Sequence, residues 1–160
     1  MIMKIELELI DIKDKNILRD MLWDYEREMV GDKAEEYKYL DSYWEKPNRF
    51  PYFIKVNGKV SGFALVNEHT LLEPGAKNLS EFYIKPEFRS FGIGKNAAFL
   101  VWDLFPGKWE GRQIRENPKA HSFWLKVKGE YTKNNFKEVE MNNDKWNGWI
   151  QTFDNSLELK

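Results

Sequence analysis

The chain has 160 residues, of which 42% are hydrophobic, and its 25 basic and 26 acidic side chains leave a net charge of −1. This length and composition are typical of one globular domain that can bury a core without metal or disulfide support. The balanced charge disfavours nucleic-acid binding, and the absence of cysteine excludes disulfides, cysteine nucleophiles and thiolate metal sites.

The N-terminal stretch "MIMKIELELI" lacks the basic region, apolar core and small-residue cleavage site of a signal peptide. No apolar stretch approaches the roughly 18–20 residues that cross a bilayer. His69 and His121 are the two imidazoles, and neither belongs to a spaced cluster of metal ligands. We therefore expect a cytoplasmic protein with neither a membrane partner nor a metal.

The first third of the chain predicts a strand and two helices. Residues 3–10 alternate apolar and charged side chains, which is typical of a strand with one wet face. Asp14 can cap a helix that ends at Gly31, and residues 33–44 predict a second, shorter helix. The apolar positions of the first helix are Ile17, Leu18, Met21, Leu22, Tyr25 and Met29, and those of the second are Tyr37, Leu40, Tyr43 and Trp44.

The rest of the chain alternates strands and helices. Asn57-Gly58 separates two β-rich runs and predicts a tight hairpin. A strand over 79–85 ends at Pro86, and then come a helix over 94–105 and a strand over 109–114. Asn117-Pro118 begins a helix to about 129, since Asn is a good N-cap and Pro suits the first turn. Two strands follow, over 135–141 and 146–153, so the order predicts a mixed sheet in one α+β or α/β domain.

A glycine-rich turn, "RSFGIGK", separates the strand at 79–85 from the helix at 94–105. Gly92 and Gly94 let backbone N–H groups converge at the start of that helix, where unpaired amides and the helix dipole favour an anion. Arg89 and Lys95 add positive charge, so a phosphate or pyrophosphate is the expected guest.

Two familiar phosphate motifs fit poorly. A Walker loop needs a glycine where Arg89 stands and a hydroxyl where Asn96 stands. A dinucleotide fingerprint would read Gly92-x-Gly94-x-x-Ala97, but charged residues separate the strand from Gly92, and the unit is not the first βαβ of the chain. Nucleotide binding through these glycines is kept as an alternative.

The pattern Arg-x-x-Gly-x-Gly in "RSFGIG", with "EFYIKPEF" before it and "GKNAAFLVWDLF" and "NPKAHSFW" after it, resembles the acetyl-CoA-binding motif of the GCN5-related N-acetyltransferases (the GNAT family). The resemblance covers nearly the whole chain. It implies one GNAT-like domain over 1–160, of mixed α+β class, with a central, mostly antiparallel sheet that has a V-shaped splay and is flanked by helices. It also implies acetyl-CoA as co-substrate.

The resemblance carries a set of cofactor contacts over to this sequence. The loop from Arg89 to Lys95 would hold the CoA pyrophosphate, and the backbone of Tyr83 and Ile84 would pair with the pantetheine arm like an added strand. Asn117 matches an asparagine that touches the pantetheine arm, with a plain helix cap as the other interpretation. The implied cofactor-binding residues are Tyr83, Ile84, Arg89, Ser90, Phe91, Gly92, Ile93, Gly94, Lys95, Asn117 and Trp124.

The same resemblance implies that catalysis uses a general base and a general acid. Glu81, on the strand before the loop, is the expected base, with a plain surface carboxylate as the alternative; His69, Glu73 and Tyr83 are reserves. The family's tyrosine, which protonates the leaving thiolate, is replaced by Trp124. The acid is then absent, supplied by water, or moved to Tyr131.

Two functions remain open from the sequence. One is an N-acetyltransferase that acts on a small amine or a peptide, and the other is a GNAT-fold module that binds an acyl-CoA or a partner without catalysis. Acidic residues of the first two helices can attract a cationic amine or merely form a solvated face: Asp24, Glu26, Glu28, Asp32, Glu35 and Glu36. Trp146, Trp149 and Ile150, on the terminal strand, are candidates for a homodimer contact.

Overall fold

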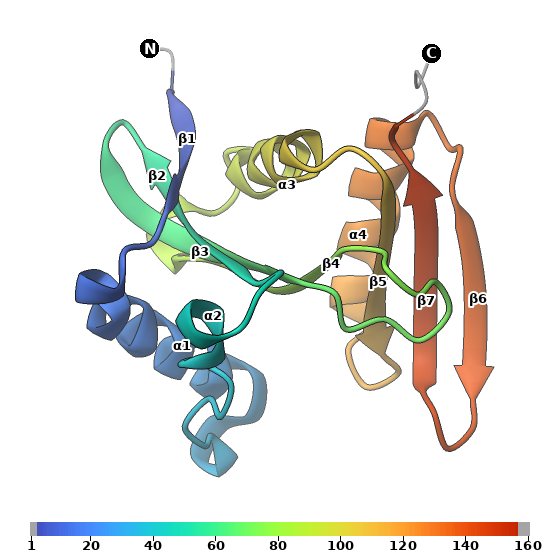
Figure 1. The fold of residues 1–160 in the computed structure, drawn as a ribbon, viewed down its shortest axis with the longest axis horizontal. Coiled ribbons are helices and arrows are strands. Elements are labelled where there is room, and N and C mark those ends of the chain that lie inside the picture. Colours follow the sequence, from blue (N-terminus) through green and yellow to red (C-terminus); the bar gives the residue numbers. More distant parts are fainter. Residues whose placement is uncertain (1–2, 157–160) are drawn as a thin grey trace. The chain divides into compact units, whose positions relative to one another are not determined.

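A computed structural model describes residues 3–156, whose elements divide between two compact units. The first unit contains the described residues of 1–67 and 81–97, and the second contains those of 68–80 and 98–160. Each predicted strand is present, and the fold is the predicted mixed α+β class, with antiparallel sheets flanked by helices (Figure 1).

The first sheet has the order β1-β2-β3-β4, with β1 at Ile5–Leu9, β2 at Phe50–Val56, β3 at Lys59–Asn67 and β4 at Asn78–Ile84. β1 and β3 each pair antiparallel with β2. Asn57 and Gly58 turn the β2–β3 hairpin with φ angles of 51° and 82°, which is the left-handed conformation that an Asn-Gly turn adopts easily. The predicted hairpin is therefore confirmed.

Helix α1, Lys15–Val30, covers one face of this sheet together with the short α2, Ser42–Glu45 (Figure 1). Gly31 ends α1 at a φ of 61°, as predicted. Asp14 occupies the N-cap position of α1 as predicted, but its side chain makes no capping hydrogen bond. Asp11 instead accepts from the N–H of Lys13 and caps a 3₁₀ turn, Ile12–Asp14, that precedes the helix. The core here consists of Ile10, Leu18, Met21, Leu22, Leu40, Tyr43, Phe53, Phe63, Leu65 and Tyr83.

The helix predicted over 33–44 is wrong. A 3₁₀ turn at Gly31–Lys33 is followed by an irregular segment, and helical structure resumes only at Ser42. Leu40 and Tyr43 are buried as expected, but Tyr39 is 60% exposed. A short isolated helix gains little from its own hydrogen bonds, so the apolar contacts with the core decide the path of this segment.

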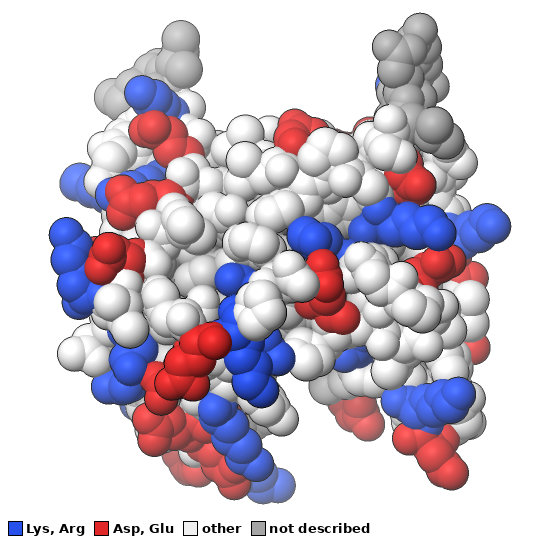
Figure 2. Space-filling model, in the orientation of Figure 1, with Lys and Arg blue, Asp and Glu red and all other residues white. Residues whose placement is uncertain are grey.

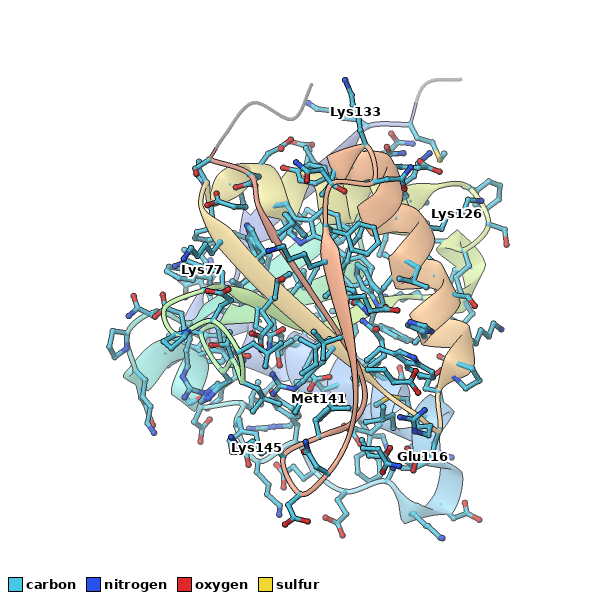
Figure 3. All side chains as sticks on the ribbon, turned by 90° about the vertical axis from the view of Figure 1, so that its right-hand side faces the viewer. Lys77, Glu116, Lys126, Lys133, Met141 and Lys145 are labelled. Carbon is cyan, nitrogen blue, oxygen red and sulfur yellow. The ribbon has the colours of Figure 1, made fainter. Side chains whose placement is uncertain are left out.

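The second unit contains a sheet of order β5-β7-β6, with β5 at Lys108–Ile114, β7 at Asn147–Asp154 and β6 at Lys137–Asn142. Helix α4, Pro118–Thr132, lies alongside this sheet (Figure 3). Helix α3, Ile93–Leu104, contributes Trp102, whose ring packs edge-on against Phe153 of β7. Because β7 is the central strand, both of its edges are paired and Ile150 is fully buried. Ile150 is therefore not exposed for the predicted homodimer contact, which stays a prediction for the partly exposed Trp146 and Trp149.

The expected central sheet is thus two sheets. Just before β4, Lys77 and Trp109 form an isolated parallel bridge. The N–H of Lys77 donates to the carbonyl of Lys108 at 2.9 Å, and the carbonyl of Lys77 accepts from the N–H of Glu110 at 2.8 Å. β4 and β5 themselves belong to different sheets. Among residues 3–156, no helix is long and apolar enough to cross a membrane.

A polar cluster is buried between α4 and the second sheet. Lys128 on α4 is 4% exposed, and its Nζ donates to Oε1 of Gln151 on β7 at 2.7 Å and lies 5.8 Å from the ring centroid of Trp124. Gln151 also donates to Gln113 at 2.8 Å and to Glu138 at 2.8 Å. Burial lowers the pKa of Lys128 to about 7, against the opposing influence of Glu138 and Glu110. Near neutral pH the side chain of Lys128 is therefore partly deprotonated.

Lys128 is expected to make the protein more stable as the pH rises from about 7 to 10. Its pKa is lowered in the folded state, so over this range the unfolded chain binds a proton that the folded chain has lost. The free energy of unfolding should rise by up to about 1.4 kcal/mol per pH unit from this group. In urea unfolding, the variant Lys128→Met should lack this rise of the unfolding free energy with pH. Lys126→Met, an exposed change on the same helix (Figure 3), should keep the rise. Equal slopes in wild type and Lys128→Met would contradict the expectation.

Candidate functional site

The loop between β4 and α3 has the geometry that an anion site needs. Ser90 and Gly92 both adopt a left-handed backbone, with φ angles of 71° and 74°, directly before α3 begins at Ile93. Residues 89–92 are exposed, while Ile93 is buried and anchors the first turn of the helix. The first amides of a helix have no acceptor within it, so the backbone here can donate to a bound phosphate.

Arg89 is held by a carboxylate that the sequence did not reveal as its partner. Its Nη1 and Nη2 donate to the two carboxylate oxygens of Glu28 on α1 at 2.5 and 2.7 Å, and its Nε donates to the carbonyl of Ile84 at 2.8 Å. The pair with Glu28 raises the pKa of Arg89, whose charge is therefore secure. Its guanidinium also lies 5.6 Å from the ring centroid of Tyr83. Arg89 thus fastens the loop to α1 and supplies a cation at the same place.

Strand β4 is the last strand of the first sheet, and Gly62 on β3 allows the backbone of β4 to come unusually close to β3. A Cβ at Gly62 would lie 2.0 Å from the carbonyl oxygen of Tyr83 and 3.1 Å from the Cα of Ile84. Only glycine fits such an approach between neighbouring strands. As the last strand in the order β1-β2-β3-β4, β4 has an outer edge that can accept a further extended chain.

Glu81 lies on β4 beside a group of tyrosines. Tyr25 of α1 donates to Oε2 of Glu81 at 2.6 Å. Burial, followed by the charge of Glu81, raises the pKa of Tyr25 well above its ordinary value, so Tyr25 keeps its proton and remains the donor. The ring of Tyr25 also packs edge-on against Tyr83 at 5.9 Å. These contacts orient the carboxylate of Glu81.

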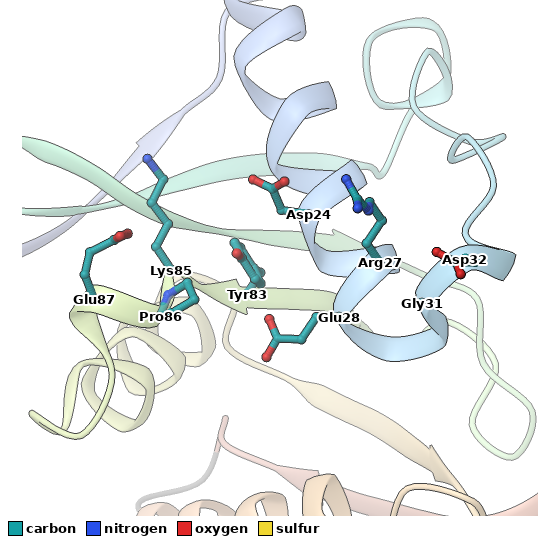
Figure 4. A pocket seen from close by; sticks show the side chains of 9 residues that line it. All are labelled: Asp24, Arg27, Glu28, Gly31, Asp32, Tyr83, Lys85, Pro86 and Glu87. Atoms are coloured by element: carbon teal, nitrogen blue, oxygen red, sulfur yellow. The ribbon is translucent and has the colours of Figure 1, made fainter.

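A cavity of about 620 Å³ opens beside the end of β4 in the first unit (Figure 4). One wall is the C-terminal half of α1, and the other is the segment from Tyr83 to Glu87. Four carboxylates and two cations line it, so its charge is mixed. The lining residues are Asp24, Arg27, Glu28, Gly31, Asp32, Tyr83, Lys85, Pro86 and Glu87.

The remaining candidate residues belong to the second unit. Asn117 caps α4, and its Oδ1 accepts from the N–H of Ala120 at 3.1 Å, as the cap interpretation expects. Trp124 is half-buried and packs edge-on against Trp102 at 6.1 Å. The hydroxyl of Tyr131 donates to Asp103 at 2.6 Å and accepts from Asn155 at 3.0 Å.

Comparison with known proteins explains this combination of loop, strand and helix. The family model described as acetyltransferase (GNAT) family matches residues 15–129. The chain belongs to the GNAT family. No curated protein matches the sequence significantly.

Solved structures share the GNAT fold with this chain over almost its full length. An acetyltransferase from Thermus thermophilus has a TM-score of 0.71 at 14% identity and covers 94% of this chain and 96% of its own. A spermidine N-acetyltransferase from Vibrio cholerae, in complex with CoA and spermine, has a TM-score of 0.66 at 15% identity, with 95% and 96% covered. An aminoglycoside acetyltransferase in complex with coenzyme A has a TM-score of 0.70 at 14% identity, with 94% and 95% covered.

The first unit contains Tyr83, Ile84, the loop of residues 89–95 and Glu81 among the predicted site residues. The second unit holds Asn117, Trp124 and Tyr131. Sequence reasoning did not find Tyr25, Glu28 or Gly62 as parts of the site. Tyr25 was recognised only as a core position of α1, and Glu28 only as part of an acidic face, because their partners lie 56 and 61 residues away in the chain.

Replacing Gly62 by alanine is expected to displace the backbone of β4 at Tyr83 and Ile84. The added methyl would overlap the Tyr83 carbonyl, and overpacking of this kind costs about 1–3 kcal/mol of unfolding free energy. Because the displaced backbone is the segment expected to pair with pantetheine, affinity for acetyl-CoA should fall as well. Thermal unfolding and acetyl-CoA titration test both effects, with Ser61→Ala, which adds no volume to the same strand, as control. Wild-type stability and affinity in Gly62→Ala would show that β4 tolerates the displacement.

Proposed function

We propose that the chain is an acetyl-CoA-dependent N-acetyltransferase that moves an acetyl group to a primary amine of a small molecule or peptide. The observation that carries this proposal is the loop of residues 89–95, where two left-handed residues and Arg89 precede the buried start of α3. Membership of the GNAT family and the CoA complexes of the spermidine and aminoglycoside acetyltransferases support it. The match over 15–129 includes residues of both units, so we infer a single acetyltransferase domain.

The residues of this chain fit the two polar parts of the cofactor. The amides from Ser90 to Lys95, with the side chains of Arg89 and Lys95, would bind the pyrophosphate. The outer edge of β4 at Tyr83 and Ile84 would pair with pantetheine, and a backbone N–H of this strand would donate to the acetyl oxygen as negative charge develops there. Asn117 and Trp124, which belong to the second unit, remain predicted cofactor contacts.

Acetyl-CoA would supply an activated acetyl group as a thioester, which the amine attacks directly in a ternary complex. An amine of the lysine type has a pKa near 10.4, so its ammonium must first lose a proton, and Glu81 would accept it. The new C–N bond then forms as the C–S bond breaks, and the second proton lost by the nitrogen balances the charge of the thiolate.

Tyr131 stays the predicted acid for that thiolate, but its surroundings oppose the role. Burial and the hydrogen bond to Asp103 raise the pKa of Tyr131 to about 12. A thiol has a pKa near 8.5, so transfer of this proton would be uphill, and the thiolate can instead leave without being protonated by the protein. Trp124, at the position of the family's tyrosine, likewise favours the second candidate function, an acyl-CoA-binding module with little or no catalysis.

Thermal unfolding with acetyl-CoA, ATP and NAD tests cofactor choice. Acetyl-CoA at 100 times its Kd should stabilise the protein by about 2.7 kcal/mol, or roughly 5–11 °C for a chain of this size, and the nucleotides should not match it. Arg89→Ala should abolish the shift. Glu28→Gln breaks the same ion pair while it leaves the Arg89 guanidinium in place, so this matched control should keep or enlarge the shift.

No shift with saturating acetyl-CoA would overturn the proposal, and an equal shift with ATP or NAD would favour the nucleotide alternative. Single-turnover release of free CoA with a panel of amines then separates the enzyme from the binding module. A binding module would show the thermal shift without any amine-dependent release of CoA.

A further inference from the structure

Arg89, the cation expected to bind the pyrophosphate, is already occupied by other groups of the protein. Its Nη1 and Nη2 donate to the two carboxylate oxygens of Glu28 on α1 at 2.5 and 2.7 Å, and its Nε donates to the carbonyl of Ile84 at 2.8 Å. A guanidinium binds a carboxylate or a phosphate best through two adjacent N–H groups. It has two such pairs, and each has lost at least one member here, so no complete pair is left for a phosphate.

The carboxylate of Glu28 binds Arg89 in the way that a phosphate of a ligand would bind it. It presents two oxygens to Nη1 and Nη2, and its charge neutralises that of the guanidinium. The pair is also open to solvent, since the two side chains are 39% and 46% exposed. Ion pairs of this exposure are weak, because water solvates the separated charges well. A pyrophosphate with more than one negative charge can therefore displace Glu28 from Arg89.

Further negative charge surrounds the ion pair. Glu28 is one of four carboxylates that line the cavity of Figure 4. Acidic side chains also gather over the end of α1 in Figure 2. While Glu28 holds Arg89, an anion that approaches the loop meets this negative charge without a free guanidinium to oppose it. Once Glu28 is displaced, Arg89 supplies that cation, and the freed carboxylate can turn toward the cavity, which Arg27 and Lys85 also line.

A purely positioning role for Glu28 would have the opposite effect on the cofactor. A carboxylate that only positions an arginine binds one pair of N–H groups and leaves the other pair for the ligand. In this protein the carbonyl of Ile84 takes the Nε member of that other pair. The geometry therefore favours competition between Glu28 and a phosphate over positioning by Glu28.

We propose that Glu28 is an internal competitor of the cofactor: its carboxylate occupies Arg89 in the free protein and is displaced when the pyrophosphate of acetyl-CoA binds. Glu28 is thus a residue that sets the affinity of the loop for its cofactor. This inference rests on the proposed acetyltransferase function and concerns the regulation of the same site. The displacement exchanges one ion pair of Arg89 for another and breaks no covalent bond.

Calorimetric titration with acetyl-CoA tests the competition. Glu28→Gln keeps the size of the side chain but removes its charge, so the Kd for acetyl-CoA should fall about two- to fivefold, the range that an exposed ion pair predicts. The same variant loses the ion pair between α1 and the loop, so the free protein should unfold at a slightly lower temperature than wild type. A competitor predicts tighter binding together with lower stability, whereas a residue that only positions Arg89 predicts a loss of both.

Asp24→Asn is the matched control for this titration. Asp24 lies one turn before Glu28 on α1 and lines the same cavity, but its carboxylate is not among the acceptors that hold Arg89. The two variants change the net charge equally. Asp24→Asn should therefore tighten the binding of acetyl-CoA less than Glu28→Gln does.

An unchanged or higher Kd in Glu28→Gln would overturn the inference. Equal tightening in Asp24→Asn would overturn it too, because the effect would then come from the net charge and not from release of Arg89. In both cases acetyl-CoA still binds, so the proposed function would stand. Absence of acetyl-CoA binding in wild type and in Glu28→Gln alike would instead overturn the proposed function, and this inference with it.

Discussion

Glu81→Gln is expected to lower kcat/KM for amine acetylation by about 10² to 10⁴, the range that general-base catalysis contributes. The amide of Gln cannot accept the proton of the amine. The carboxylate of Glu81 can accept it, and the hydrogen bond from Tyr25 orients this carboxylate. Raising the pH toward the pKa of the amine, near 10.4, should shrink the deficit, since the free amine no longer needs a base. Initial rates of CoA release across pH 7–10 measure both effects.

Two measurements test whether the lower kcat/KM of Glu81→Gln comes from loss of the base. The thermal shift with acetyl-CoA should be unchanged in Glu81→Gln, because the cofactor contacts do not include this side chain. Tyr25→Phe should lower kcat less than Glu81→Gln does, because it removes only the orienting hydrogen bond. A pH-independent loss in Glu81→Gln would assign Glu81 to the structure of β4 instead of the chemistry.

Glu110→Ala should be the most destabilising single change, with a loss of about 3–5 kcal/mol of unfolding free energy. Glu110 is 1% exposed, and its two oxygens accept from the N–H groups of Leu71, Leu72 and Glu73 at 2.6, 2.9 and 2.9 Å. The truncation leaves three backbone donors without the carboxylate that binds them, and such charge-assisted bonds are stronger than neutral ones.

Urea unfolding followed by circular dichroism measures this loss. Glu110→Gln keeps the size of the side chain but turns an NH₂ group toward backbone donors, so an intermediate loss is expected. Glu116→Gln, an exposed change near the end of the same strand, should stay within about 0.5 kcal/mol of wild type. A loss below about 1 kcal/mol in Glu110→Ala would mean that water replaces the carboxylate in binding the 71–73 segment.

Local sequence patterns were enough to predict most helices and strands and the loop of residues 89–95. The Asn57-Gly58 turn, the Gly31 end of α1 and the Asn117-Pro118 start of α4 depend on the conformations of single residues, which the sequence states directly. The segment at 33–44 failed because its aromatic spacing reflects contacts with the core of the first unit and not a helix. The terminal position of β7 in the chain likewise says nothing about its central position in the sheet.

The amino-acid sequence by itself determined the family and predicted the anion-binding role of the loop with Arg89 and of Glu81 as base, because these depend on neighbouring residues in a short motif. Only the tertiary structure decided that Glu28 holds Arg89, that Tyr25 orients Glu81 and that Gly62 admits the backbone of Tyr83. The same is true of Lys128, whose pKa falls because the fold buries its side chain. Partners that lie tens of residues apart meet through packing, and packing depends on the whole chain.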